Sequence, residues 1–495
     1  MNKMIHINKN DNVAVALVPV EKGESFTFEG KSVVALENIP QGHKMALANL
    51  PSGTRIIKYG FPIGHVTADV PAGGWIHTQN VKTDLSEESD YTYNPAIKPL
   101  APLQAETFSG YRWEDGRAGI RNELWIIPTV GCVNDVSETM VRQNQHLVEE
   151  FGLDGLHCFQ HPYGCSQMGD DHATTRKILA DLVRHPNAGA VLVVSLGCEN
   201  ITMDQFKAEL GEWNDSRVKF MICQDYEDEL EQGGELLQQL AEYAGQFKRQ
   251  PLPMSELVVG MKCGGSDGLS GITANPTVGA FSDLLVAQGG SVMLTEVPEM
   301  FGAEEALLNR CVNREVFDAA VNMINSFKDY FTAHDQVVYE NPSPGNKQGG
   351  ITTLEDKSLG CVQKGGTAPV VDVLQYGELV RKKGLTLLSA PGNDLVSATA
   401  LTASGCHVIL FTTGRGTPFS APAPTVKISS NNALYNKKTN WIDFNAGTVV
   451  EGETIAEVGR RLMEYVKQLA SGERLTKAEE NNYRGIAIFK DGVTL

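Results

Sequence analysis

From Phe108 onward, apolar runs of strand length alternate with amphipathic stretches of helix length. Strands joined through helices do not form hairpins, so they lie parallel in a sheet whose faces the helices cover. The polar segment "GQFKRQ" divides the alternation into two parts. We therefore expect two α/β domains with mainly parallel sheets, one over residues 108–250 and a larger, Rossmann-like one over residues 251–495.

The larger of these two domains contains a stretch that breaks the alternation. Apolar periodicity predicts helices over residues 276–288, 303–328, 370–382 and 454–470. Residues 339–368 show no such periodicity, and we expect one long irregular loop there. Loops of that length within a compact domain are usually functional or disordered.

The first ninety residues have a different pattern, with short β segments between four turns. Each turn places a proline before a glycine: "VPVEKG", "IPQG", "LPSG" and "VPAG". Proline fixes the first dihedral angle of a turn and glycine takes the strained position, so each marks a reversal between strands. We expect a small all-β module over residues 1–90, followed by a polar, Pro-rich linker over residues 91–107.

Composition narrows the class of function. The 495-residue chain has 42 Lys and Arg against 60 Asp and Glu, a formal net charge of −18, which argues against nucleic acid or an anionic membrane as a partner. The amino terminus lacks a signal-peptide pattern, and the apolar runs are too short to span a bilayer, so we expect a cytoplasmic protein. Its nine cysteines should then be reduced and serve as core fillers, metal ligands or nucleophiles.

Four cysteines share the pattern Gly-Cys-x-Asn/Gln. Cys132, Cys165 and Cys198 lie 33 residues apart, and Cys361 falls near the end of the expected irregular loop. The spacing matches one strand–helix unit, so the first three should each follow a strand, at the edge where open parallel sheets bind ligands. Thiolates there are potential ligands for iron or zinc, and small buried thiols in tight turns are the alternative.

In the larger domain, a glycine-rich segment over residues 262–279 joins a strand to a helix. Its backbone amides and Lys262 could hold an anion, but the segment matches no nucleotide-binding motif. The next strand is followed by Glu296 and Glu299, which are potential metal ligands or bases. A later strand is followed by Arg415, which could bind a carboxylate.

The β module supplies potential bases. His43 and His77 lie in or beside glycine-rich turns, and Lys58 and Asn80 lie close to the same turns. A single histidine here would more often be structural, but repeated His and Lys in such turns suit a general base with a cation beside it.

These motifs, in this order, make the whole chain resemble the altronate and galactarate dehydratase family. The module resembles the family's SAF-type β-clip in "IPQGHKMAL" and "GTRIIKYGFPIGHVTADVPAGGWIHTQNV". The remainder resembles its two catalytic-region domains in "GYRWEDGRAGIRN", "HPYGCSQ", "LGCEN", "KCGGSDGLSGITANPTVG", "TEVPEMFGAE" and "TGRGTPFSAPAPTVKIS". The resemblance covers nearly the full length.

The resemblance implies a hydro-lyase that converts a sugar acid, D-altronate, to 2-dehydro-3-deoxy-D-gluconate, with ferrous iron or manganese as cofactor. Dehydration of galactarate and elimination of sulfite from sulfolactate are alternatives within the family. A non-catalytic sugar-acid binding protein is the alternative from another class. Galactarate has a second carboxylate, for which Arg112, Arg117 or Arg121 could form a pocket. We expect a small sugar acid as the ligand and a homo-oligomer, such as a dimer, as the assembly.

This reaction removes the proton beside a carboxylate and gives an enediolate-like intermediate, which needs a base and a metal or a cluster of cations. We expect the base to come from the β module, as His43, His77 or Lys58. We also expect the module to close over a site at the strand ends of the α/β domains.

The remaining roles fall to other candidates. Lys262 and Arg415 would neutralise the carboxylate, and Asn80 would bind hydroxyl groups. The metal ligands would come from a set of five residues: Cys132, Cys165, Cys198, Cys361 and Glu296.

Overall fold

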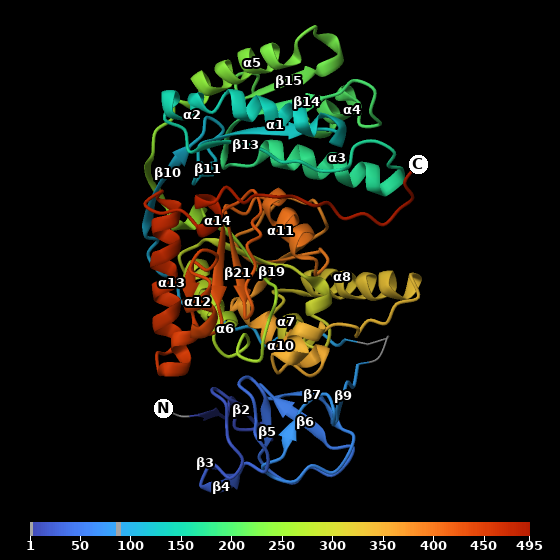
Figure 1. Cartoon of the computed structure of the whole chain (residues 1–495), viewed down its shortest axis with the longest axis vertical. Coiled ribbons are helices and arrows are strands. Elements are labelled where there is room, and N and C mark those ends of the chain that lie inside the picture. Colours follow the sequence, from blue (N-terminus) through green and yellow to red (C-terminus); the bar gives the residue numbers. More distant parts are fainter. Residues whose placement is uncertain (1–2, 86–90) are drawn as a thin grey trace.

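The computed structural model describes residues 3–85 and 91–495 and stacks three parts along its longest axis (Figure 1). The β module lies at one end, an α/β domain with a four-stranded sheet at the other, and an α/β domain with a seven-stranded sheet between them. The predicted fold class, a small all-β module followed by α/β domains with parallel sheets, is confirmed. The predicted end of the module, at residue 90, lies outside the described residues.

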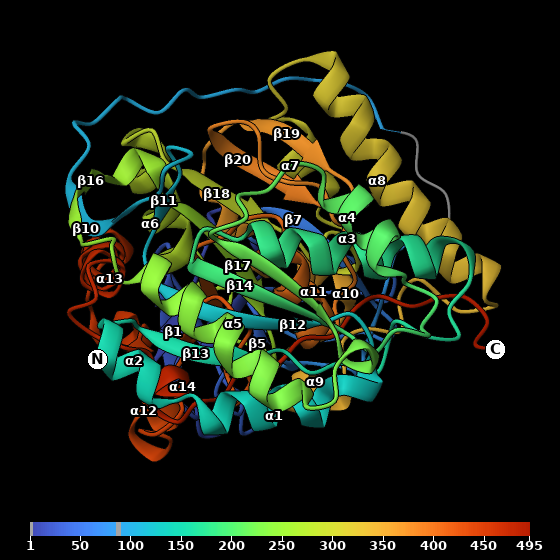
Figure 2. The same cartoon turned by 90° about the horizontal axis from the view of Figure 1, so that it is seen from above.

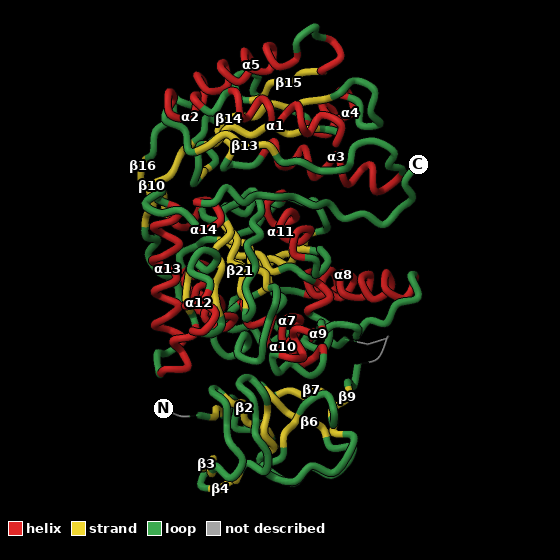
Figure 3. Tube along the Cα trace, in the orientation of Figure 1, coloured by secondary structure: helices red, strands yellow, loops and turns green. Residues whose placement is uncertain are grey.

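The module consists of short strands in three antiparallel sheets, ordered β1-β2-β5-β8, β3-β4 and β6-β7-β9. The strands are β1 Met4–Ile5, β2 Val13–Ala16, β3 Ser25–Phe28, β4 Lys31–Val34, β5 Lys44–Ala46, β6 Arg55–Lys58, β7 Phe61–Val66, β8 Trp75–Ile76 and β9 Val81–Lys82. The four predicted turn glycines, Gly23, Gly42, Gly53 and Gly73, have φ between +81° and +91°, where a Cβ is disfavoured. Among the described residues, the module contains no helix, and all helices lie in the other two parts (Figure 3).

The four-stranded domain has the parallel order β13-β12-β14-β15. Its strands are β12 Glu123–Pro128, β13 Gly155–Cys158, β14 Ala188–Ser195 and β15 Val218–Ile222. Helices α3 Gly169–Arg184 and α4 Met203–Leu210 cover one face, and α1 Asn134–Gln143, α2 His146–Phe151 and α5 Glu229–Ala244 cover the other. Separate apolar clusters under the two faces hold the layers together.

The seven-stranded domain is also parallel, in the order β19-β20-β18-β17-β21-β22-β23. Its strands are β17 Val258–Cys263, β18 Ser291–Leu294, β19 Val370–Leu374, β20 Gly384–Leu388, β21 Val408–Thr413, β22 Thr425–Ser429 and β23 Phe444–Asn445. Its helices are α6 Ala274–Ala287, α7 Glu304–Leu308, α8 Arg314–Ala333, α9 Pro344–Gln348, α10 Leu354–Cys361, α11 Asp394–Ala403, α12 Asn432–Lys437, α13 Ile455–Ala470 and α14 Lys477–Glu480. A small antiparallel sheet of β10 Thr107–Arg112, β11 Ala118–Gly119 and β16 Gln250–Pro253 lies where the two α/β domains meet.

Two local predictions in this domain are wrong. The expected helix over residues 370–382 begins as strand β19, because its valines pair with β20 inside the sheet. The expected irregular loop over residues 339–368 contains α9 and α10. Both helices begin at side-chain caps, which apolar periodicity does not detect: Ser343 accepts from Asn346 N, and Thr353 accepts from Asp356 N.

The module is bound firmly to the middle domain, because one apolar core continues from one into the other. Val13, Ile56 and Ile76 of the module belong to the same buried cluster as Met261 and Leu354 of the middle domain. Residues 91–106 then run as an extended arm along the side of the molecule (Figure 2). Among the described residues, no helix combines the length and apolar character that a membrane crossing requires.

Candidate active site

A buried charge cluster joins the module to the middle domain. Lys44 opens β5, Lys58 ends β6, and Asp356 lies in the first turn of α10. Lys44 Nζ and Lys58 Nζ each lie 2.8 Å from a different oxygen of Asp356. The side chains of Lys44 and Asp356 have no exposed surface and that of Lys58 has 2%. Two ammonium groups therefore share one carboxylate out of water.

This sharing separates the acidities of the two lysines. Burial lowers the pKa of Lys44 to about 8, and the nearby charge of Lys58 adds to that effect. Burial alone would also lower the pKa of Lys58, but the Asp356 carboxylate outweighs it, and the pKa of Lys58 lies above its usual value. Burial would raise the pKa of Asp356, but the two lysines hold it well below its usual range. Lys44 is thus the group here that can lose a proton near neutral pH.

Two predicted histidines lie together beside Lys44. The ring centroids of His43 and His77 are 4.5 Å apart. The indole Nε1 of Trp75 donates to His43 Nδ1 at 3.2 Å, so the proton of the neutral ring is on Nε2, 3.3 Å from Gln348 O. Burial lowers the pKa of both rings, to about 4 for His77, so both are neutral at pH 7. His77 Nδ1 is buried and has no hydrogen-bond partner among the described residues.

A second buried cluster lies at the other end of α10. Cys263 ends β17, Cys361 ends α10, and Glu299 lies in the turn after β18. Cys263 Sγ is 3.3 Å from Cys361 Sγ, and Glu299 Oε2 is 2.9 Å from the first sulfur and 3.1 Å from the second. In the part of the chain that the structure describes, only these three residues bring three potential metal ligands within 4.8 Å of one another.

The chemistry of this donor set is compatible with a metal ion. Two thiols and one carboxylate are ligands of the kind that iron and zinc accept, whereas manganese is typically bound by oxygen ligands. The contact with Cys361 lowers the pKa of Cys263 to about 7, so one thiolate forms readily. Lys357 Nζ, 2.7 Å from Glu299 Oε1, and Lys364 Nζ, 3.1 Å from Cys263 Sγ, balance the negative charge of the donors.

A small cavity connects the two clusters. Its volume is about 10 Å³, and its lining includes Lys58, Tyr59, Asp356, Lys357 and Cys361. A space of that size holds about one water molecule. A six-carbon sugar acid is larger than this space.

The predicted glycine-rich segment forms another wall of this cavity, through Ser266, Asp267, Gly268, Ser270 and Gly271. Gly268 lies against the turn of the module, and a Cβ on it would overlap Gly42 O. Gly42 itself lies close to Gly349, and a Cβ on Gly42 would be 2.7 Å from Gly349 O. Glycine is required at these positions because two backbones meet there.

The other predicted substrate-binding residues have different surroundings. Lys262 is fully buried between Glu296 and Asp394, with Nζ–O distances of 2.9 and 2.7 Å, so its charge is already neutralised. Asn80 uses its amide within its own turn, donating to Trp75 O. Arg415 is exposed, and its Nη1 donates to Gln348 Oε1 at 3.1 Å, which leaves it near the α9 end of the site.

The predicted metal ligands also separate. Cys361 lies in the buried donor set, but Glu296 does not, because its two oxygens accept from Lys262 Nζ and Cys263 N. Cys132, Cys165 and Cys198 are exposed at the carboxyl edge of the four-stranded sheet, in a different domain. The structure therefore does not bring the five predicted ligands together.

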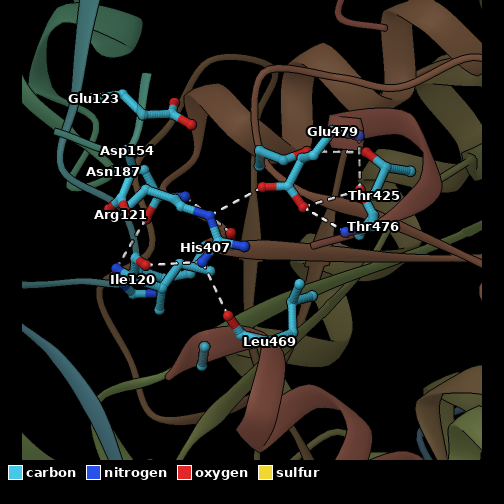
Figure 4. A network of polar contacts seen from close by, with 12 residues as sticks. Ile120, Arg121, Glu123, Asp154, Asn187, His407, Thr425, Leu469, Thr476 and Glu479 are labelled. Atoms are coloured by element: carbon cyan, nitrogen blue, oxygen red, sulfur yellow. Dashed lines mark hydrogen bonds and ion pairs between the residues drawn. The ribbon is translucent and has the colours of Figure 1, made fainter. Parts of the chain in front are cut away.

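The three arginines considered for a second carboxylate all have protein partners. Arg112 pairs with Glu256 at 2.5 Å and Arg117 with Asp115 at 2.6 Å. Arg121 is buried between the two α/β domains, 3.0 Å from Glu479 (Figure 4).

Several residues of the two clusters were not singled out from the sequence: Lys44, Asp356, Lys357, Lys364 and Cys263. Lys44 directly follows the predicted base His43, and Cys263 lies inside the predicted glycine-rich segment. Both therefore lie next to or within motifs that the sequence analysis identified. Their partners lie far along the chain, as the 312-residue separation of Lys44 and Asp356 shows.

Comparison with known proteins agrees with this architecture in chain order. Family models match residues 2–84 (Altronate/galactarate dehydratase SAF domain), 110–245 (D-galactarate dehydratase/Altronate hydrolase, second domain) and 254–494 (D-galactarate/Altronate dehydratase, C-terminal). The chain belongs to the altronate/galactarate dehydratase family, which confirms the resemblance found in the sequence.

Curated relatives cover the chain nearly from end to end. The altronate dehydratase of Bacillus subtilis (strain 168) is 53% identical over 100% of both chains, and that of Escherichia coli (strain K12) is 51% identical over 99% of both. The galactarate dehydratase (L-threo-forming) of Escherichia coli (strain K12) is 36% identical, over 96% of this chain and 94% of its own.

Proposed function

We propose that this chain is a hydro-lyase that dehydrates D-altronate to 2-dehydro-3-deoxy-D-gluconate. The observation that carries the proposal is the buried contact of Lys44, Asp356 and Lys58 next to the donor set of Cys263, Glu299 and Cys361. In this proposal, one contact would supply a base, cations and a metal site. Full-length similarity to two altronate dehydratases supports the same reaction class.

Lys44 is our candidate for the base that removes the proton beside the carboxylate. Its pKa of about 8 leaves a fraction of the amine neutral at pH 7, and a catalytic base works best with a pKa near the working pH. Asp356 Oδ2 and Gly350 O, each 2.8 Å from Lys44 Nζ, fix its position. Lys58 keeps its proton and is better suited to stabilise negative charge. His77, with its free Nδ1, is the second candidate for the base.

The enediolate-like intermediate carries two negative charges, and the cavity offers cations to meet them. Lys58 and Lys357 both line it. A ferrous ion would be held by Cys263, Glu299 and Cys361, where it would supply Lewis-acid stabilisation of the carboxylate and hydroxyl oxygens. Manganese is the alternative metal, and the two sulfur ligands argue against it.

D-Altronate is favoured over galactarate for two reasons. Identity to the altronate dehydratases is 51–53%, compared with 36% to the galactarate dehydratase. The arginines considered for a second carboxylate are engaged with Glu256, Asp115 and Glu479. We also propose that the reaction takes place in the cytoplasm, since all nine cysteines are free thiols, and that the protein forms a homodimer.

The test is release of 2-keto acid by purified protein with ferrous iron under reducing conditions. D-Altronate, galactarate and sulfolactate are supplied separately, and keto acid or sulfite is measured. We expect turnover of D-altronate at least tenfold faster than of the other two. Faster turnover of galactarate or sulfolactate would reassign the substrate, and binding without turnover of any of them would identify a sugar-acid binding protein instead.

A further inference from the structure

Three exposed cysteines lie together at one edge of the four-stranded domain, away from the active site. Cys132 follows β12, Cys165 follows β13 and Cys198 follows β14. Since β12 is hydrogen-bonded to both β13 and β14, the three loops leave the carboxyl edge of the sheet side by side. That edge is where open α/β sheets bind ligands.

The loops that carry these thiols are joined to one another. Three hydrogen bonds connect them in pairs: Gly131 N to Tyr163 O (2.9 Å), Ile201 N to Gly164 O (3.3 Å) and Thr129 Oγ1 to Glu199 Oε1 (2.7 Å). A Cβ on Gly164 would overlap Thr129 O, so the approach of the first two loops requires glycine. Ser166, directly after Cys165, has a φ of +61°, a strained conformation that often marks functional sites.

Polar side chains lie beside two of the three thiols, Cys165 and Cys198. Asn200 Oδ1 accepts from Ser166 N at 2.9 Å and lies 3.5 Å from Cys165 Sγ. Gln224 Nε2 lies 3.8 Å from Cys198 Sγ, as a donor to sulfur. Gln167 is only 3% exposed, yet its Nε2 has no partner among the described residues. Such amide donors are available to bound sulfur or to a ligand on it.

We propose that Cys132, Cys165 and Cys198 bind an iron–sulfur cluster of the [4Fe–4S] type. Thiolates are soft ligands that select such clusters. The three sulfur atoms are not all within 4.8 Å of one another, a condition that, in the described ranges, only the donor set around Cys263 satisfies. The three sulfurs thus do not enclose a single ion here, and a cluster, which spreads its ligands over several iron atoms, suits three neighbouring loops better.

Three protein ligands leave one iron of the cluster with a free position, which a water or a hydroxy acid can occupy. Equal amounts of ferrous and ferric iron with sulfide supply the cluster without a further oxidant, and the three thiols release their protons on binding. This inference goes beyond the sugar-acid activity and does not depend on it.

The test is anaerobic reconstitution of the full chain with ferrous iron, ferric iron and sulfide, in a Cys361→Ser background that weakens the other iron site. Bound iron, acid-labile sulfide and visible absorption are measured after desalting. We expect about four iron and about four sulfide per chain. The matched control Cys158→Ser, in the same sheet, should bind equally, and Cys132→Ser, Cys165→Ser and Cys198→Ser should each lose most of the bound sulfide.

Two results would overturn the inference. One is iron bound without sulfide, which would mean a single ion only. The other is unchanged iron and sulfide in all three single variants, and in the triple variant if it folds. The single substitutions are at exposed positions, so circular dichroism should find them folded like the control.

Discussion

The pattern Gly-Cys-x-Asn/Gln occurs in two different settings in this molecule. Three copies lie in exposed loops after parallel strands of the four-stranded domain. The fourth lies at the end of α10, where Cys361 is only 3% exposed. What precedes the pattern decides its setting: a buried strand leads to the sheet edge, whereas a helix capped by Thr353 leads into the contact with the module.

The two settings suit different chemistry. The buried copy shares its helix with Asp356 and Lys357, so it belongs to a closed centre of paired charges, where proton transfer and charge stabilisation are strong. The exposed copies have polar neighbours and open access, which suits assembly of a metal group from solution. A short motif therefore predicts a kind of turn or ligand, and its function depends on the surrounding charges.

The largest effect should come from breaking the buried charge cluster. In Asp356→Asn, Lys44 and Lys58 lose their shared counter-charge inside the protein, which should cost about 3–5 kcal/mol of stability and abolish turnover. Urea unfolding measures the loss. Asp394→Asn is the matched control, because Lys262 keeps its second partner Glu296. Equal stability of the two variants would contradict the account.

The next effect tests the buried donor set. The background for this test is the triple variant Cys132→Ser/Cys165→Ser/Cys198→Ser. In it, Cys361→Ser should weaken ferrous iron binding more than about tenfold, because substitution of residues that only hydrogen-bond to a metal ligand already lowers metal affinity by about tenfold or more. Titration under anaerobic conditions, with no sulfide present, measures it. Cys311→Ser, at another buried cysteine of the same domain, should leave binding unchanged. Iron binding that is lost in the background alone would place the ion in the exposed setting.

A smaller effect concerns pH. Turnover should rise as the pH passes through about 8, because Lys44 loses its proton there, and the histidines cannot give this limb since their pKa values are lowered. In Lys58→Met, burial still lowers the pKa of Lys44, but the neighbouring charge that lowers it further is gone, so the limb should move to higher pH. Initial rates across the pH range measure the shift. A limb that stays in place would mean that Lys44 is not the base.

The smallest effect separates the two settings by access. Brief treatment of the metal-free protein with iodoacetamide should modify Cys132, Cys165 and Cys198 first, because the other six cysteines are buried or half-buried. Peptide mass spectrometry locates the modified thiols. Early modification of Cys263 or Cys361 would show that the module opens readily.

The fold was predictable because it depends on local pattern. Alternating strands and helices predicted the parallel sheets, and the turn glycines from Gly23 to Gly73 adopt the positive φ expected of them. The errors arose where a different local signal prevailed. The valine-rich run from Val370 pairs in the sheet, and the caps Ser343 and Thr353 start helices in a stretch without apolar periodicity.

The site was less predictable because its partners are distant in sequence. Lys262 was predicted to bind an anion, but Glu296, which follows β18, forms an ion pair with it. Lys44 was not singled out from the sequence, and nothing local marks Asp356 as its partner. Cys361 was predicted as a metal ligand, but its companion Cys263 comes from another strand end and was not.

The central claim is that the reaction occurs at the contact between the module and the middle domain, with Lys44 as the base. Lys44→Met tests it most directly, because Asp356 keeps Lys58 as its partner and the fold should remain intact. Keto acid release from D-altronate should fall by about 10²–10⁴-fold, with little change in thermal unfolding. A Lys44→Met protein that is folded and releases keto acid at near the unaltered rate would contradict the account.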